Sequence, residues 1–154
     1  MATNTDHSET MYDLTSVLDV DALESVRPGT SILVSGPAMT GKQNLSYDVL
    51  TDGIADGEGA VVVSTGDRAE TVIEAFSDRI GDGELALGVV DCAADQSSAQ
   101  SRPNDGIFVH HVSSPGDLTG IGIGITEALE ALHDRGIDEG RLALSSLSTM
   151  LPYT

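Results

Sequence analysis

The sequence is poor in aromatic residues, cysteine and cations, and each shortage excludes something. Aromatic residues make up 3% of the chain and tryptophan is absent, so Ala, Val, Ile and Leu must build any core. The single cysteine, Cys92, can form no internal disulfide, which is typical of a protein kept in a reducing cytoplasm. No apolar run approaches about 18 residues, and no cationic segment followed by an apolar one opens the chain. The sequence therefore predicts neither a membrane span nor a secretion signal.

Cations are the scarcest charged groups. Seven Lys and Arg residues face 25 Asp and Glu residues, which gives a net charge of −18. Such a charge repels the phosphate backbone of DNA and RNA, so nucleic acid is not an expected partner. Many carboxylates, few cations and a core of small residues are typical of a halophilic protein in a salt-rich cytoplasm, with an ordinary acidic protein as the alternative.

The length of 154 residues suits one domain, and the pattern of apolar residues predicts an α/β fold. Residues 1–10 are polar and are expected to form a disordered tail, and helical turns are expected over 11–26. The remaining pattern alternates strands over 32–35, 60–64, 85–90, 107–110 and 142–147 with helices over 43–50, 69–80 and 118–133. This alternation predicts a mainly parallel sheet with helices packed on it.

The most informative stretch is the glycine-rich loop Gly36–Pro37–Ala38–Met39–Thr40–Gly41–Lys42, which has the spacing of a phosphate-binding loop. Its glycines allow backbone N–H groups to point into one concavity, and the following helix adds its positive N-terminal end. Lys42 supplies a mobile charge for the outer phosphates. The alternative is a glycine-rich turn between strand and helix that binds nothing.

The last position of the loop departs from this pattern. A Ser or Thr hydroxyl is expected there as a ligand of Mg²⁺, but the sequence has Gln43. A neutral and longer amide side chain leaves the phosphate cradle in place and makes the use of Mg²⁺ uncertain. The sequence therefore assigns no metal ligand.

Other polar residues lie where the strands are expected to end. Asp67 follows the second strand, where a carboxylate could orient a water molecule, although a solvated turn aspartate is an equal alternative. The glycines of Gly120–Gly124 lack the spacing of a dinucleotide site and predict close helix packing instead. His110 and His111 are neighbours on a strand, so they face opposite sides and cannot share a metal.

Three segments together resemble the RecA superfamily, and specifically its KaiC-like and RecA-like ATPases of halophilic archaea. They are Ser31–Lys42, Val61–Glu70 and Arg141–Met150. Val112–Gly124 is similar to a signature of a haloarchaeal branch sometimes called HTR-like. The resemblance covers roughly residues 12–154, so residues 11–154 are expected to form a partial RecA-like nucleotide-binding domain of three layers.

The resemblance implies that Gly36–Gln43 holds the phosphates of ATP. The family's catalytic glutamate pair falls on Gly66 and Asp67, which leaves Asp67 as the catalytic candidate, and its Walker B aspartate falls on Ser145. The family continues with further strands and helices, so either a partner completes the sheet or the chain is a shortened product. Assemblies in this family make homo-oligomers plausible, with Arg102 and Arg141 as guesses for a trans-acting arginine.

The expected function is ATP binding with weak or no hydrolysis and a regulatory or signalling role through a protein partner. Removing one electrostatic stabiliser typically costs a factor of about 10²–10³ in rate, and both Gln43 and Ser145 lack the usual metal-supporting chemistry. Two alternatives remain. One is an active Mg²⁺-dependent ATPase in which Asp67 and Asp91 compensate, and the other is a scaffold that binds only simple anions.

Overall fold

Four parallel strands form the central sheet of the computed structural model, which describes residues 11–93 and 107–146. Their order in space is β3 (Phe108–His111), β2 (Leu87–Asp91), β1 (Gly59–Ser64) and β4 (Gly140–Leu144). All three pairings are parallel, so the carboxyl ends of the strands share one edge of the sheet. The predicted parallel α/β sheet is confirmed.

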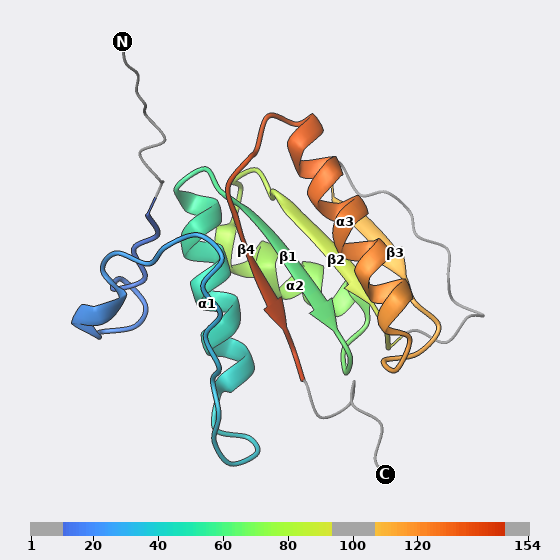
Figure 1. The fold of residues 1–154 in the computed structure, drawn as a ribbon, viewed down its shortest axis with the longest axis horizontal. Helices are drawn as coiled ribbons and strands as arrows, with labels where there is room; N and C mark the ends of the chain where they lie inside the picture. Colours follow the sequence, from blue (N-terminus) through green and yellow to red (C-terminus); the bar gives the residue numbers. More distant parts are fainter. Residues whose placement is uncertain (1–10, 94–106, 147–154) are drawn as a thin grey trace.

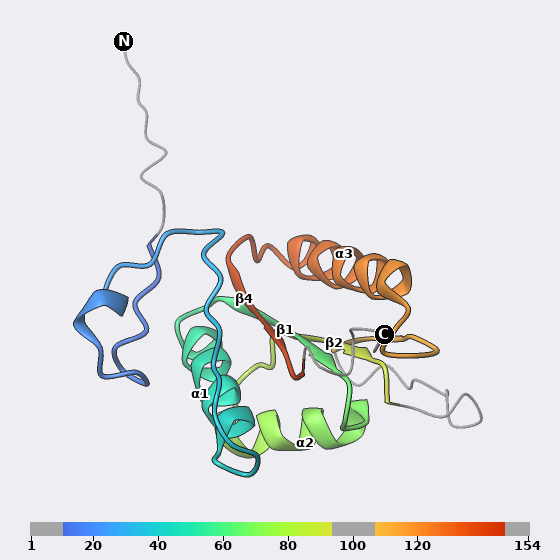
Figure 2. The same cartoon turned by 60° about the horizontal axis from the view of Figure 1, so that its bottom comes forward.

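Helices cover both faces of the sheet. Figure 2 shows α1 (Lys42–Ala55) and α2 (Ala69–Ile80) below the sheet and α3 (Leu118–Asp134) above it. The result is three layers. In the described part of the chain, no helix is long and apolar enough to cross a membrane.

The core consists mainly of aliphatic side chains, as the shortage of aromatic residues requires. Every residue of β1 and β2 is buried, which fits their position at the centre of the sheet. The larger apolar cluster lies between the sheet and the helices α1 and α2. It includes Tyr47, Leu50, Val62, Val72, Phe76, Leu87 and Val89. The α3 face is formed by Val61, Val63, Val90, Ile121, Ala128 and Leu132 among others.

The boundaries of α2 and α3 follow local signals in the sequence. α2 spans the predicted residues 69–80. α3 begins after Asp117, whose side-chain oxygen accepts the N–H of Gly120, and it ends just before Gly136 at φ +81°. These two helices therefore confirm the sequence pattern almost to the residue.

The first helix is longer than its sequence predicts. Residues 51–55 were expected in a connection because of their Gly and Asp content, but α1 continues to Ala55. The Thr51 hydroxyl donates to the carbonyl of Tyr47, so it does not compete with the helix. A Cβ at Gly53 would lie 2.8 Å from the Arg141 side chain, which shows that tertiary packing uses this glycine.

The strand predicted at residues 32–35 is wrong. Ile32, Leu33 and Val34 are 46%, 76% and 38% exposed, and the segment is assigned to no strand of the described sheet. Both sides of β1 are already taken by β2 and β4, and the segment instead runs along α1 in both views (Figures 1 and 2). An apolar segment can be buried as a strand only where a neighbouring strand pairs with its backbone N–H and C=O groups.

Residues 11–26 contain short helical turns, as expected: the Leu18 N–H donates to the Leu14 carbonyl, and a 3-10 turn follows. Tyr12 and Val26 pair near the two ends of this segment in an antiparallel bridge, and the 3-10 turn covers Asp21–Leu23. The expected tail at 1–10, the expected loop at 93–106 beyond Ala93, and the end of the last predicted strand at Leu147 lie outside the described residues.

The glycines of α3 give a matched test of helix packing. A Cβ on Gly124 would lie 3.0 Å and 3.1 Å from the methyl groups of Val90, whereas no described atom lies within 4 Å of a Cβ on Gly122. We expect Gly124→Ala to lower the free energy of unfolding by about 1–3 kcal/mol through overpacking. Gly122→Ala should raise it by up to about 1 kcal/mol through helix propensity. Thermal unfolding of both variants measures this, and equal melting temperatures would contradict it.

Candidate phosphate-binding site

The glycine-rich loop leads directly into α1. Gly41 is the residue before the helix and has the left-handed φ of +88°, which glycine adopts without strain. Met39 also has a positive φ, +61°, and its side chain is fully exposed. Gly41 brings no side chain to cap the helix, so the first backbone N–H groups of α1 need another partner.

Lys42 folds back over the loop. Its Nζ donates to the carbonyl oxygens of Gly36 at 2.5 Å and Pro37 at 3.0 Å, and the Thr40 hydroxyl donates to Pro37 at 2.7 Å. Lys42 is also the only lysine in the sequence. The only lysine ammonium group is therefore bound by neutral carbonyl oxygens of the loop, and an anion is a stronger partner that can replace them.

Gln43 connects the loop to the turn after β1. Its Nε2 donates to Asp67 Oδ2 at 2.7 Å and lies 3.3 Å from the Tyr47 hydroxyl. Burial, followed by the nearby charge of Asp67, raises the pKa of Tyr47 to about 12. The sequence predicted that Asp67 lies near the loop, and the structure confirms this. The direct hydrogen bond between Gln43 and Asp67 could not be predicted from the sequence.

Hydroxyl groups shape the turn that carries Asp67. The backbone oxygen of Asp67 accepts from the Ser64 hydroxyl at 2.5 Å, and the Thr65 N–H donates to the Ser145 hydroxyl at 2.9 Å. Ser145 follows β4, so the ends of β1 and β4 are joined at this point. The expected meeting of Ser64–Asp67 with Ser145 at the carboxyl edge is confirmed.

Asp91 lies at the same edge of the sheet, but its carboxylate is hydrogen-bonded to backbone groups away from the loop. It is completely buried, and its two carboxylate oxygens accept the N–H groups of Ala69 and Ala93. The first of these bonds fixes the start of α2. Asp91 therefore serves the fold, and the hypothesis that it compensates for a missing metal ligand finds no geometric support.

The two histidines of β3 point to opposite sides, as predicted. His110 Nδ1 lies 3.1 Å from Glu127 on α3, and His111 Nδ1 lies 3.6 Å from Asp91. Within residues 11–93 and 107–146, no three His, Cys, Asp or Glu side chains are grouped to hold a metal. Burial, and after it the charges of Asp91 and Asp117, raise the pKa of Cys92 to about 11, so its thiol stays protonated at neutral pH.

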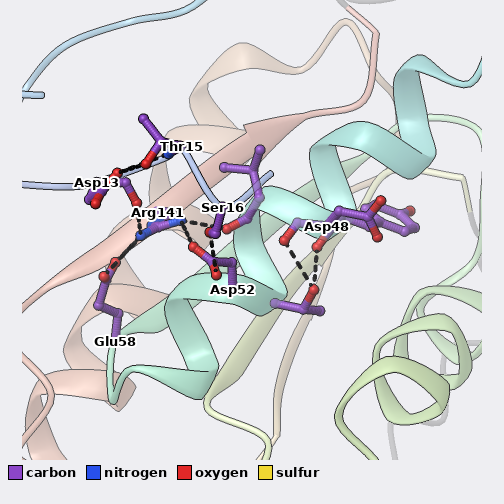
Figure 3. A network of polar contacts seen from close by, with 10 residues as sticks. Asp13, Thr15, Ser16, Asp48, Asp52, Glu58 and Arg141 are labelled. Atoms are coloured by element: carbon purple, nitrogen blue, oxygen red, sulfur yellow. Dashed lines mark hydrogen bonds and ion pairs between the residues drawn. The ribbon is translucent and has the colours of Figure 1, made fainter. Parts of the chain in front are cut away.

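Arg141 lies at the C-terminal half of α1, in a network of polar contacts (Figure 3). Its guanidinium contacts both carboxylate oxygens of Glu58, at 2.9 Å and 3.1 Å, and Asp52 at 3.2 Å, and it donates to the Val49 carbonyl at 2.7 Å. Only 8% of its side chain is exposed. The side chain is thus occupied inside its own chain, which does not favour the trans-acting role suggested for Arg141. Arg102 lies outside the described residues.

Comparison with known proteins gives one match. Residues 29–154 match the model of a family of unknown function, DUF7504. No curated protein and no solved structure matches the chain. The match begins just before the glycine-rich loop and includes every helix and strand of the sheet.

Proposed function

The chain belongs to DUF7504, a family of unknown function, and we propose that it binds the phosphates of a nucleotide, ATP foremost, with little or no hydrolysis. The observation that carries this proposal is the position of Lys42. Its ammonium group donates to two carbonyls of the loop that leads into α1, whose N-cap residue forms no side-chain cap. A polyphosphate placed there gains a full charge, backbone N–H donors and the helix dipole together.

Weak hydrolysis follows from the residues beside the cradle. Phosphoryl transfer depends on positioned charge, usually with a metal ion that bridges the outer phosphates. Gln43 offers an amide where a hydroxyl ligand is expected, and Ser145 offers a hydroxyl where the resemblance places a carboxylate. The proposal therefore describes a RecA-like nucleotide sensor in the cytoplasm that acts on a protein partner or on further copies of itself.

The decisive test is an ATP titration by calorimetry in multimolar KCl, which screens the net charge of −18. Losing the charge-assisted bonds of Lys42 costs about 1.5–3 kcal/mol, so Lys42→Ala should bind about 10–100-fold more weakly. The control is Arg135→Ala, which removes the same charge beside Glu84, beyond the C-terminal end of α3 and away from the loop. It should leave the affinity within about twofold. Equal affinity of Lys42→Ala and wild type would refute the proposal.

Two further outcomes separate the remaining hypotheses. Equal thermal stabilisation by sulfate and by ATP would indicate a site for simple anions. The contact between Gln43 and Asp67 keeps a second function open, an active Mg²⁺-dependent ATPase. That function requires Mg²⁺-dependent release of phosphate that disappears in Asp67→Ala.

A further inference from the structure

We infer that this site binds its nucleotide without a divalent cation, because the Gln43 amide is already hydrogen-bonded to Asp67, the carboxylate that a metal site would need. The inference rests on the proposed nucleotide binding and concerns the form of the ligand, free ATP rather than its Mg²⁺ complex. Its basis is the bond from Gln43 Nε2 to Asp67 Oδ2 at 2.7 Å.

The orientation of the Gln43 amide follows from the chemistry of its partner. An ionised carboxylate only accepts hydrogen bonds, so the atom facing Asp67 must be the NH₂ group and the amide oxygen must point elsewhere. The same nitrogen lies 3.3 Å from the Tyr47 hydroxyl. Mg²⁺ requires oxygen ligands at about 2.0–2.1 Å in octahedral geometry, and an amide nitrogen is not among them.

The second partner of the amide is firmly placed. Tyr47 is 3% exposed, and its ring packs against Phe76 with a centroid distance of 4.9 Å. Gln43 and Tyr47 are four residues apart on α1 and share one face of the helix. The amide is therefore held between a buried phenol and a carboxylate, and a metal would have to displace it.

The other oxygen groups at this edge are also engaged. Ser145 accepts the N–H of Thr65 at 2.9 Å, and its neutral hydroxyl brings no anionic charge to hold metal-bound water. Asp91 is fully buried, and its carboxylate accepts hydrogen bonds from two backbone N–H groups. Among residues 11–93 and 107–146, Asp67 is thus the carboxylate that contacts the end of the loop, and Gln43 already binds it. The donor set does not fit Mg²⁺.

Positive charge for the phosphates must then come from the protein itself. Lys42 and the N-terminal N–H groups of α1 supply it without a metal. Asp67 is an unfavourable neighbour for a metal-free phosphate and a favourable one for a metal complex. The two forms of the ligand therefore predict opposite effects when the charge of Asp67 is removed.

The experiment measures the affinity for ATP in multimolar KCl, once with excess Mg²⁺ and once with EDTA, for wild type, Asp67→Asn and Lys42→Ala. We expect wild-type protein to bind at least as tightly in EDTA as in Mg²⁺. Asp67→Asn keeps the shape of the side chain, and its affinity should be unchanged or up to about threefold tighter in both buffers.

Each other outcome has one meaning. Wild-type binding that is tenfold or more tighter with Mg²⁺, or weakened in Mg²⁺ by Asp67→Asn, would overturn the metal-free site while leaving nucleotide binding intact. Absence of binding in both buffers would overturn the proposed function and this inference with it. Binding in EDTA that Lys42→Ala does not weaken would place the nucleotide elsewhere and would also overturn the inference.

Discussion

Arg141→Ala is expected to lower the free energy of unfolding by about 3–5 kcal/mol, a large part of the stability of a domain this size. The substitution leaves the carboxylates of Glu58 and Asp52 without their shared cation, and their side chains are only 12% and 23% exposed. It also removes the donor to the Val49 carbonyl and the guanidinium that lies over the Tyr12 ring at 5.9 Å. Urea unfolding in multimolar KCl measures the change.

The control for Arg141 is the ion pair of Arg135, whose own side chain is 24% exposed but whose carboxylate partner is open to solvent. Arg135 Nη2 lies 2.6 Å from Glu84, whose side chain is 84% exposed, so Arg135→Ala should cost less than about 1 kcal/mol. Salt screens the exposed pair far more than the buried one. If both substitutions lowered the free energy of unfolding equally, the network in Figure 3 would contribute no more to stability than the Arg135 ion pair.

Phe76→Ala is expected to cost about 3–5 kcal/mol. Phe76 is fully buried beneath the sheet and packs against Tyr47 in the cluster of α1 and α2. In a core with almost no other aromatic ring, aliphatic neighbours cannot fill the resulting cavity without moving the helices. The matched control is Leu129→Ala, which truncates a side chain that is 49% exposed and should cost less than about 1 kcal/mol. Similar melting temperatures for the two variants would contradict this reading of the core.

Local patterns predicted the parts of the fold that local physics decides. The continuous apolar run of β1, the Asp117 cap of α3 and the stop at Gly136 all lie within a few residues of the elements they define. The segment at 32–35 failed because pairing depends on strands far away in the sequence. The predicted end of α1 was wrong because Thr51 and Gly53 are weak helix formers, yet the Thr51 hydroxyl bonds within the helix and Gly53 is packed closely against the distant Arg141.

The candidate site divides in the same way. The spacing of Gly36, Gly41 and Lys42 is visible in the sequence. Lys42 contacts Gly36 across only six positions of the chain, so this contact is local. The contact of Gln43 with Asp67 joins residues 24 positions apart, and the Arg141 network spans more than 80. Such pairs depend on the order of strands in the sheet, which hydrophobic patterns do not encode.

The Arg141 network also sets the time at which the chain can complete its fold during synthesis. Glu58 and Asp52 precede their cation by 83 and 89 positions, and β1 gains its second neighbour only when β4 is made. At about 5–20 residues per second, the ribosome leaves these carboxylates unpaired for roughly 4–18 seconds. During that interval β1 lacks its β4 neighbour and leaves an unpaired edge, and the strong negative charge of the chain opposes its association with others.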